Sequence, residues 1–112
     1  SLREAPAERR IAVLGDMLEL GPTAADLHRE IGRLASGLGI DALYLFGEYA
    51  AATAAGVRDG GGLPPEAVHC LPTHAAIAAA IAVTVRSGDW VLVKGSRGQR
   101  MEEVVRLLGA AE

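Results

Sequence analysis

This chain has few of the residues that mark several broad protein classes. It has a single cysteine, Cys70, so it can form no internal disulfide, which is typical of proteins in a reducing, cytoplasmic setting. The longest hydrophobic run, from Ala75 to Val85, is too short to cross a bilayer. Residues 1–6 lack the apolar core of a signal peptide. We therefore expect a cytoplasmic protein with no membrane partner.

Positive charge is scarce and scattered. The chain has eleven Lys and Arg and a net charge of −3 at pH 7. Nucleic-acid binding needs a basic face, so we expect no nucleic-acid partner. His69, Cys70 and His74 lie close together, but their spacing matches no common zinc pattern, and neighbouring strand residues point to opposite faces. We expect no metal site there, and we expect Cys70 to pack in the core.

The length of 112 residues and the hydrophobic content of 50% suit one domain with a modest core. We expect a polar lead-in over residues 1–9 and one domain over residues 10–112. Short apolar runs predict four buried strands, at Arg10–Leu14, Ala42–Phe46, Ala67–Leu71 and Trp90–Val93. A helical pattern follows each run. This alternation predicts an α/β fold: a Rossmann-like, doubly wound, mainly parallel sheet of about four strands with flanking helices.

The helical patterns predict what each helix buries. The first opens at Pro22-Thr23, and its apolar positions form one face that should pack on the core: Leu27, Ile31, Leu34, Ala35 and Leu38. The second is short, over residues 48–55, and residues 58–66 read as a flexible loop. The third, over residues 75–86, is apolar nearly all round, so it should be covered on more than one side. The last covers residues 101–108.

The loop after the fourth strand has the composition of an anion-binding loop. Gly95 and Gly98 allow a ligand to approach the backbone closely. Lys94 and Arg97 add positive charge, and Ser96 adds a hydroxyl. The following helix contributes N–H groups and the positive end of its dipole. We predict that this loop binds a carboxylate or phosphate. The alternative is a helix cap with solvated charges.

The loop after the first strand carries two carboxylates, Asp16 and Glu19, at the same edge of the sheet. In open α/β sheets, ligands sit at the carboxyl ends of the strands. A carboxylate there can accept a hydrogen bond from an ammonium, a hydroxyl or a backbone N–H. The alternative is an ordinary strand-to-helix connection in which Asp16 caps a turn. Neither loop has the spacing of a Walker A loop or of a dinucleotide fingerprint.

Three segments, in this order and spacing, resemble a known family: residues 14–21 (LGDMLELG), 27–32 (LHREIG) and 93–98 (VKGSRG). They are similar to the C-terminal domain of MurF, a member of the Mur ligases, and the resemblance covers nearly all of residues 10–109. The first of the three segments is similar to MurF rather than to its sister ligases.

The resemblance implies an enzyme of peptidoglycan precursor synthesis, and with it a role in cell wall biogenesis, cell shape and cell division. In such cytoplasmic, three-domain ligases, ATP phosphorylates the carboxylate of UDP-N-acetylmuramoyl-tripeptide. The amine of D-alanyl-D-alanine then attacks the acyl phosphate and forms a C–N bond. ATP and magnesium are bound mainly by the middle domain, while the C-terminal domain contributes to the dipeptide pocket. Lys94, Ser96 and Arg97 would then suit the dipeptide carboxylate, and Asp16 its ammonium.

The resemblance also implies limits for this chain on its own. The UDP-binding domain, the P-loop domain and the Asn-Ala-Asn-Pro-like segment that opens the family's C-terminal domain would lie outside it. We therefore expect the fragment to be inactive alone and to bind no cofactor. Its sheet should expose an edge, so we expect the fragment to self-associate, whereas the full enzyme should be a monomer.

Two other functions remain as alternatives. The chain fits a free-standing, small α/β ligand-binding module with no catalysis of its own. It also fits the C-terminal domain of another Mur ligase or of a folylpolyglutamate ligase, although the Met17–Leu20 string argues against that choice.

Overall fold

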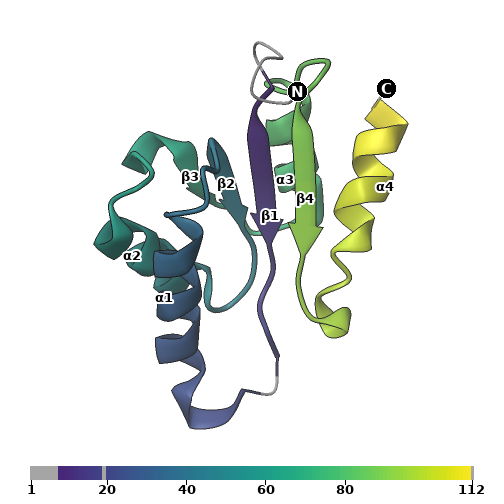
Figure 1. The fold of residues 1–112 in the computed structure, drawn as a ribbon. Coiled ribbons are helices and arrows are strands. Elements are labelled where there is room, and N and C mark those ends of the chain that lie inside the picture. The colour runs from purple at the N-terminus through teal and green to yellow at the C-terminus, as the bar shows by residue number, and fades with distance from the viewer. Residues whose placement is uncertain (1–7, 19, 112) are drawn as a thin grey trace.

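The strands form one parallel sheet. The computed structural model describes residues 8–18 and 20–111. In this part of the chain the strands are β1 (Arg10–Leu14), β2 (Ala42–Leu45), β3 (Val68–Cys70) and β4 (Trp90–Lys94), in the spatial order β3-β2-β1-β4 (Figure 1). The predicted α/β class and parallel sheet of about four strands are confirmed.

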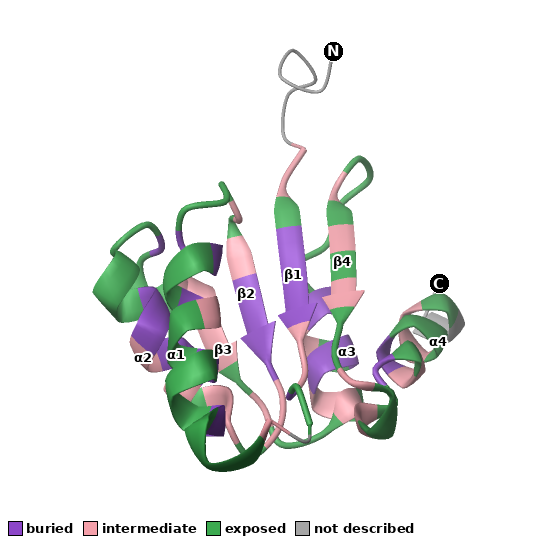
Figure 2. Ribbon diagram, turned by 60° about the horizontal axis from the view of Figure 1, so that its bottom comes forward, coloured by how far each residue is buried: buried purple, intermediate pink, exposed green. Residues whose placement is uncertain are grey.

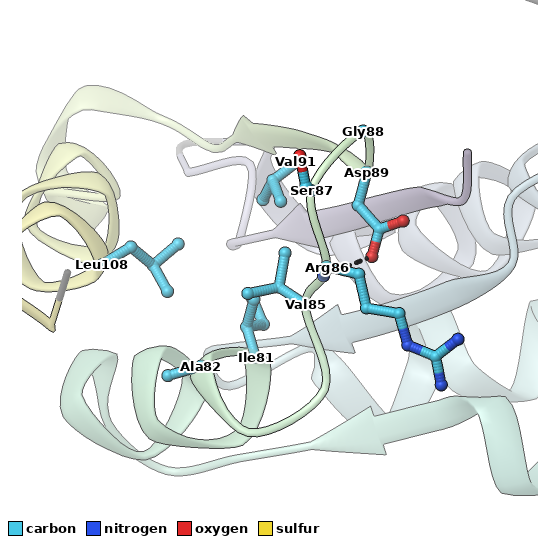
Figure 3. Close-up of a pocket in the computed structure, with 9 residues that line it drawn as sticks. All are labelled: Ile81, Ala82, Val85, Arg86, Ser87, Gly88, Asp89, Val91 and Leu108. Atoms are coloured by element: carbon cyan, nitrogen blue, oxygen red, sulfur yellow. Dashed lines mark hydrogen bonds between the residues drawn. The ribbon is translucent and has the colours of Figure 1, made fainter. Parts of the chain in front are cut away.

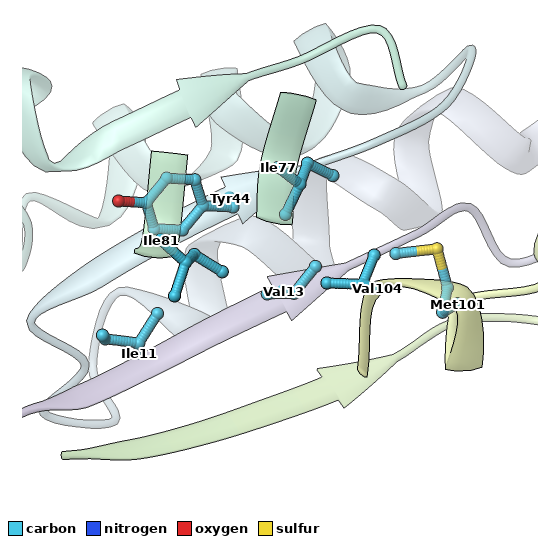
Figure 4. Close-up of a cluster of buried hydrophobic side chains, with 7 residues drawn as sticks. All are labelled: Ile11, Val13, Tyr44, Ile77, Ile81, Met101 and Val104. Atoms are coloured by element: carbon cyan, nitrogen blue, oxygen red, sulfur yellow. The ribbon is translucent and has the colours of Figure 1, made fainter. Parts of the chain in front are cut away.

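Helices cover both faces of this sheet. α1 (Ala24–Ala35) and α2 (Ala50–Gly60) lie on one face, and α3 (His74–Ala82) and α4 (Glu102–Ala111) lie on the other (Figure 1). Alternate strand residues supply a core to each layer. On the α3/α4 side the buried cluster is Ile11, Val13, Tyr44, Ile77, Ile81, Met101 and Val104 (Figure 4). On the α1/α2 side it is Ala12, Leu43, Leu45, Ala54, Val57 and Leu63.

α1 packs on α2 mainly through small residues, so the predicted apolar face is right at Ala35 and wrong at its leucines. Its buried residues are Ala24, His28, Gly32 and Ala35, whereas Leu27, Leu34 and Leu38 are 42%, 56% and 66% exposed. Figure 2 shows the outer side of α1 as exposed. The physical reason is close approach: a Cβ on Gly32 would lie 1.9 Å from the Thr53 carbonyl oxygen, so no bulky layer fits between the helices.

α2 runs longer than predicted, because Gly56 does not end it. The helix continues to Gly60, and Gly61 with a φ of 74° forms its left-handed cap. Gly56 instead serves the contact with α1, since a Cβ there would lie 1.8 Å from the Arg29 carbonyl oxygen. The predicted loop over residues 58–66 is correspondingly shorter.

α3 is shorter than predicted and begins at the expected cap. The Thr73 hydroxyl accepts the Ala76 N–H at 3.0 Å. Ile77 and Ile81 face the sheet, and α4 packs alongside, so two sides are covered as expected. Val83, just after the helix, remains 84% exposed.

Both sheet edges are partly exposed. On β4, Trp90 and Leu92 are 57% and 55% exposed on the side that carries α1 and α2 elsewhere in the sheet. At the other edge Cys70 is exposed, so its predicted place in the core is wrong. The reason is that β3 has three residues and pairs on one side with β2. None of the helices in the described part of the chain has the length and apolar stretch that a membrane span requires.

Candidate functional site at the ends of β1 and β4

The two loops singled out in the sequence meet at the carboxyl ends of β1 and β4. These strands are neighbours, but the chain leaves β1 toward β2 and returns from β3 to the opposite side of β1. In a doubly wound sheet this reversal of strand order opens a crevice where ligands bind. The fold therefore places both loops at the position where such sheets hold ligands.

Hydrogen bonds join the two loops directly. The Ser96 N–H donates to the Asp16 carbonyl oxygen at 3.0 Å, and the Leu18 N–H donates to Ser96 Oγ at 2.8 Å. The Asp16 N–H donates to Gln99 Oε1 at 3.3 Å. Because Ser96 Oγ accepts from Leu18, its hydroxyl hydrogen is left to donate elsewhere.

Glycines let the loops approach. A Cβ on Gly95 would lie 2.7 Å from Met101 Cγ and 3.2 Å from Gly15 Cα. A Cβ on Gly98 would lie 2.7 Å from Leu18 Cδ1. Gly95 and Gly98 thus let the two loops pack together. From the sequence we predicted only that a ligand could approach their backbone closely.

Asp16 lies beneath the surface of the site. It is 3% exposed, and its two carboxylate oxygens accept the N–H groups of Glu48 at 2.7 Å and Tyr49 at 3.0 Å. These residues precede α2, and a negative charge at a helix N-terminus is stabilising. A Cβ on Gly47, whose φ is 117°, would lie 2.4 Å from Asp16 Cγ. This geometry matches the alternative in which Asp16 caps a turn. Glu19 lies outside the described residues.

A hollow of about 390 Å³ opens beside β4 at this edge. Four of the predicted site residues line it, namely Lys94, Gly95, Ser96 and Arg97, together with Val93, Met101, Glu102 and Val105. The Glu102 carboxylate gives the hollow an acidic group beside its cationic ones. In the sequence, the only signal for Glu102 was its place in the first turn of the helix after the loop.

Comparison with known proteins identifies the family. The family model for the Mur ligase, glutamate ligase domain matches residues 1–97. This chain belongs to that family. UDP-N-acetylmuramoyl-tripeptide--D-alanyl-D-alanine ligase of Escherichia coli (strain K12) is 37% identical over 102 residues, which cover 88% of this chain and 21% of the relative. The ligase of the same name from Treponema pallidum (strain Nichols) is 36% identical over 103 residues, 91% of this chain and 22% of the relative.

Solved structures agree with this assignment. MurF from Acinetobacter baumannii matches 89% of this chain and 22% of its own, with a TM-score of 0.77 and 24% identity, which supports the fold. MurF ligase from Thermotoga maritima in complex with ADP matches 93% of this chain and 22% of its own, with a TM-score of 0.69 and 25% identity. The predicted resemblance to MurF is confirmed. The chain spans about a fifth of the length of the curated relatives it matches.

The Mur ligase domain has a larger hollow, of about 490 Å³, at the opposite end of β4 (Figure 3). Its carboxylate, Asp89, has a fully buried side chain that accepts hydrogen bonds from the Arg9 guanidinium at 2.7 Å and the Arg86 N–H at 2.9 Å. The bond from Arg9, followed by that from Arg86, lowers the pKa of Asp89 to about 2. Because Asp89 is committed to these contacts and much of the lining is apolar, this hollow is a weaker candidate for a polar substrate.

Two histidines support the domain's candidate site from within. His28 is 2% exposed, and its Nε2 lies 3.0 Å from the Met17 nitrogen. His74 Nε2 lies 2.7 Å from the Gln99 carbonyl oxygen, and its ring stacks on Phe46. These contacts join helices to the site loops across 11 and 25 positions of sequence, so spacing alone could not reveal them.

Proposed function

We propose that this Mur ligase domain is the C-terminal part of a ligase that adds D-alanyl-D-alanine to UDP-N-acetylmuramoyl-tripeptide, forming a C–N bond. The curated relatives that bear this activity in their names support the proposal, at 32% to 37% identity. Since the chain spans about a fifth of their length, the remaining substrates are held elsewhere in the ligase. On this proposal the 112-residue chain alone does not catalyse ligation.

The observation that carries the proposal is the mixed charge of the hollow at the end of β4. A free dipeptide has a carboxylate at one end and an ammonium at the other. Lys94, Ser96 and Arg97 offer two cations and a hydroxyl for the carboxylate, while Glu102 offers a carboxylate for the ammonium. The volume of about 390 Å³ falls within the range of small-molecule sites.

The domain's part in the reaction is binding and orientation. Holding the dipeptide by its carboxylate aims its amine at the activated carboxyl group of the tripeptide, which lowers the entropic cost of the encounter. We assign to this chain no residue that holds ATP or magnesium. Its loops lack the Walker A spacing, and in the described residues no three His, Cys, Asp or Glu side chains gather as metal ligands.

On this proposal Asp16 does not bind the ammonium of the dipeptide directly. We propose that it supports the site from below, because its carboxylate is buried and already accepts two backbone hydrogen bonds. Gly95 and Gly98 likewise act by letting the loops pack.

The setting of the ligase follows from the same proposal. Peptidoglycan precursors with a UDP group are cytoplasmic metabolites in the family's reaction, so the ligase would act in the cytoplasm and serve cell shape and division. We propose that the full enzyme is a monomer. The isolated domain would self-associate through exposed apolar residues such as Trp90 and Leu92.

Kinetics of the full-length ligase that contains these residues test the proposal. Ser96→Ala and Arg97→Ala should each raise the KM for D-alanyl-D-alanine about tenfold, as expected for the loss of one charge-assisted hydrogen bond. The KM values for ATP and for the UDP-tripeptide should change by less than about twofold, because the two substitutions remove contacts to the dipeptide and to no other substrate. Arg29→Ala is the matched control, since Arg29 pairs with Asp59 on the α1/α2 layer. An unchanged dipeptide KM would remove Ser96 and Arg97 from the site.

A further inference from the structure

His28 lies on α1 directly behind the loop that follows β1. Its Nδ1 is 2.7 Å from the Ala24 carbonyl oxygen, and its Nε2 is 3.0 Å from the Met17 nitrogen. The ring stacks on Tyr49, with centroids 4.6 Å apart. Because a backbone N–H can only donate, Nε2 must accept from Met17, so Nδ1 carries the proton and donates to Ala24. The contacts therefore define one neutral tautomer of His28.

The backbone that His28 holds is also the backbone that holds Ser96. Leu18, which follows Met17, donates its N–H to Ser96 Oγ at 2.8 Å. Asp16, which precedes Met17, accepts the Ser96 N–H on its carbonyl oxygen at 3.0 Å. Ser96 is thus fixed through both neighbours of the residue that His28 binds.

We propose that His28 is a positioning residue for the hollow at the end of β4. Its Nε2 lone pair fixes the Met17 N–H, and through Asp16 and Leu18 it sets where Ser96 presents its hydroxyl. A purely space-filling histidine would need only the shape of its ring, whereas here both ring nitrogens are in use. That the hollow holds a ligand rests on the proposed function, whereas the placement of the Ser96 hydroxyl by His28 does not.

Two amide side chains separate the roles of the two ring nitrogens. In His28→Gln the side-chain oxygen reaches the place of Nε2 and can accept from Met17. In His28→Asn the shorter side chain reaches the place of Nδ1 and can donate to Ala24, but nothing accepts from Met17. Both variants lose the ring that stacks on Tyr49, so each is the matched control for the other.

Amide hydrogen exchange of the 112-residue chain reads out the difference. Relative to the buried Leu45 amide in β2, the Met17 and Leu18 amides should exchange about tenfold faster in His28→Asn than in His28→Gln, as expected for one lost hydrogen bond. A structural role alone would change both variants equally. Equal relative exchange at Met17 and Leu18 in the two variants would overturn the proposal.

The wild-type chain gives a second test that needs no variant to fold. Two-bond ¹H–¹⁵N spectra of the imidazole report which nitrogen carries the proton. The proposal requires the proton of His28 on Nδ1. A proton on Nε2 would overturn it, because that nitrogen could not accept from Met17.

Titration with D-alanyl-D-alanine separates this inference from the proposed function. If both hold, the dipeptide should bind about fivefold more weakly to His28→Asn than to His28→Gln, since Ser96 is less well placed. Exchange that differs between the variants, with no dipeptide-induced shift in any of them, would uphold the positioning of Ser96 and contradict the proposed ligand.

Discussion

Asp89 shows how one carboxylate ties the start of the fold to the turn before β4. Its side chain is fully buried and accepts hydrogen bonds from the Arg9 guanidinium, the Arg9 N–H and the Arg86 N–H. These bonds favour the charged form and lower its pKa to about 2. An Asp in an unfolded chain titrates near pH ~4, so the folded state binds fewer protons in between. The contribution to stability is therefore present above that pH and is lost as the pH falls toward 2.

Asp89→Asn should lower the free energy of unfolding at pH 7, because the charged acceptor for Arg9 is lost. The gap in the free energy of unfolding between the wild type and the variant should narrow as the pH falls from about 5 to 2, because the wild-type carboxyl takes up its proton in this range. Urea denaturation at several pH values measures this gap. Glu66→Gln, at an exposed position of the connection before β3, is the control and should stay within about 0.5 kcal/mol of the wild type. A gap that keeps the same size from pH 7 to pH 2 would contradict the role of the charge.

At the scale of elements, the α1/α2 pair is held by backbone proximity. Gly32 on α1 and Gly56 on α2 each face a carbonyl oxygen of the other helix at a distance that leaves no room for a Cβ. Sequence periodicity favours the face with the largest side chains, and it therefore predicted that Leu27 and Leu34 would be buried. The face with small residues forms the contact, because two helices with glycines at their contact can pack more closely than two helices with leucines there.

Gly56→Ala should destabilise the chain, although alanine is the better helix former by about 0.8–1 kcal/mol. The new Cβ forces the helices apart, a kind of overpacking that costs about 1–3 kcal/mol. Gly109→Ala on α4 is the matched control: in the described part of the chain, nothing beyond its chain neighbours and its own helix backbone lies within 4 Å of a Cβ there. Helix propensity should therefore act alone and stabilise by up to about 1 kcal/mol. Chemical denaturation of both variants decides the matter. Stabilisation by Gly56→Ala as large as that by Gly109→Ala would contradict the close contact of the two helices at Gly56.

The exposed side of α1 gives a second prediction at this scale. Leu34→Glu should leave the free energy of unfolding within about 0.5 kcal/mol of the wild type, because Leu34 is 56% exposed. Ala35→Glu, one position along, should destabilise by at least about 2 kcal/mol, because Ala35 is 5% exposed and a charge would be buried there. Chemical denaturation of both variants measures the two free energies of unfolding. Equal loss of stability in the two variants would contradict the packing of α1 through Ala35 rather than Leu34.

At the scale of the whole molecule, the fold was predictable because strand and helix patterns alternate without interruption. The same order placed both loops at one edge of the sheet, and four predicted residues, Lys94 to Arg97, do line one hollow. What the sequence could not give were contacts between distant segments. Whether Asp16 faces solvent or the start of α2 depends on Glu48 and Tyr49, more than thirty residues away. The sequence places Glu102 in the first turn of the last helix, but it does not show that this helix position also lines the hollow beside β4.

An NMR titration of the ¹⁵N-labelled chain with D-alanyl-D-alanine tests directly whether the hollow beside β4 binds the dipeptide. We expect saturable shifts at residues 94–98 and at Glu102, smaller shifts with L-alanyl-L-alanine, and about tenfold weaker binding of D-alanyl-D-alanine to Ser96→Ala. Saturable binding confined to the hollow beside Asp89, or shifts that Ser96→Ala leaves unchanged, would contradict the claim that the end of β4 holds the dipeptide carboxylate.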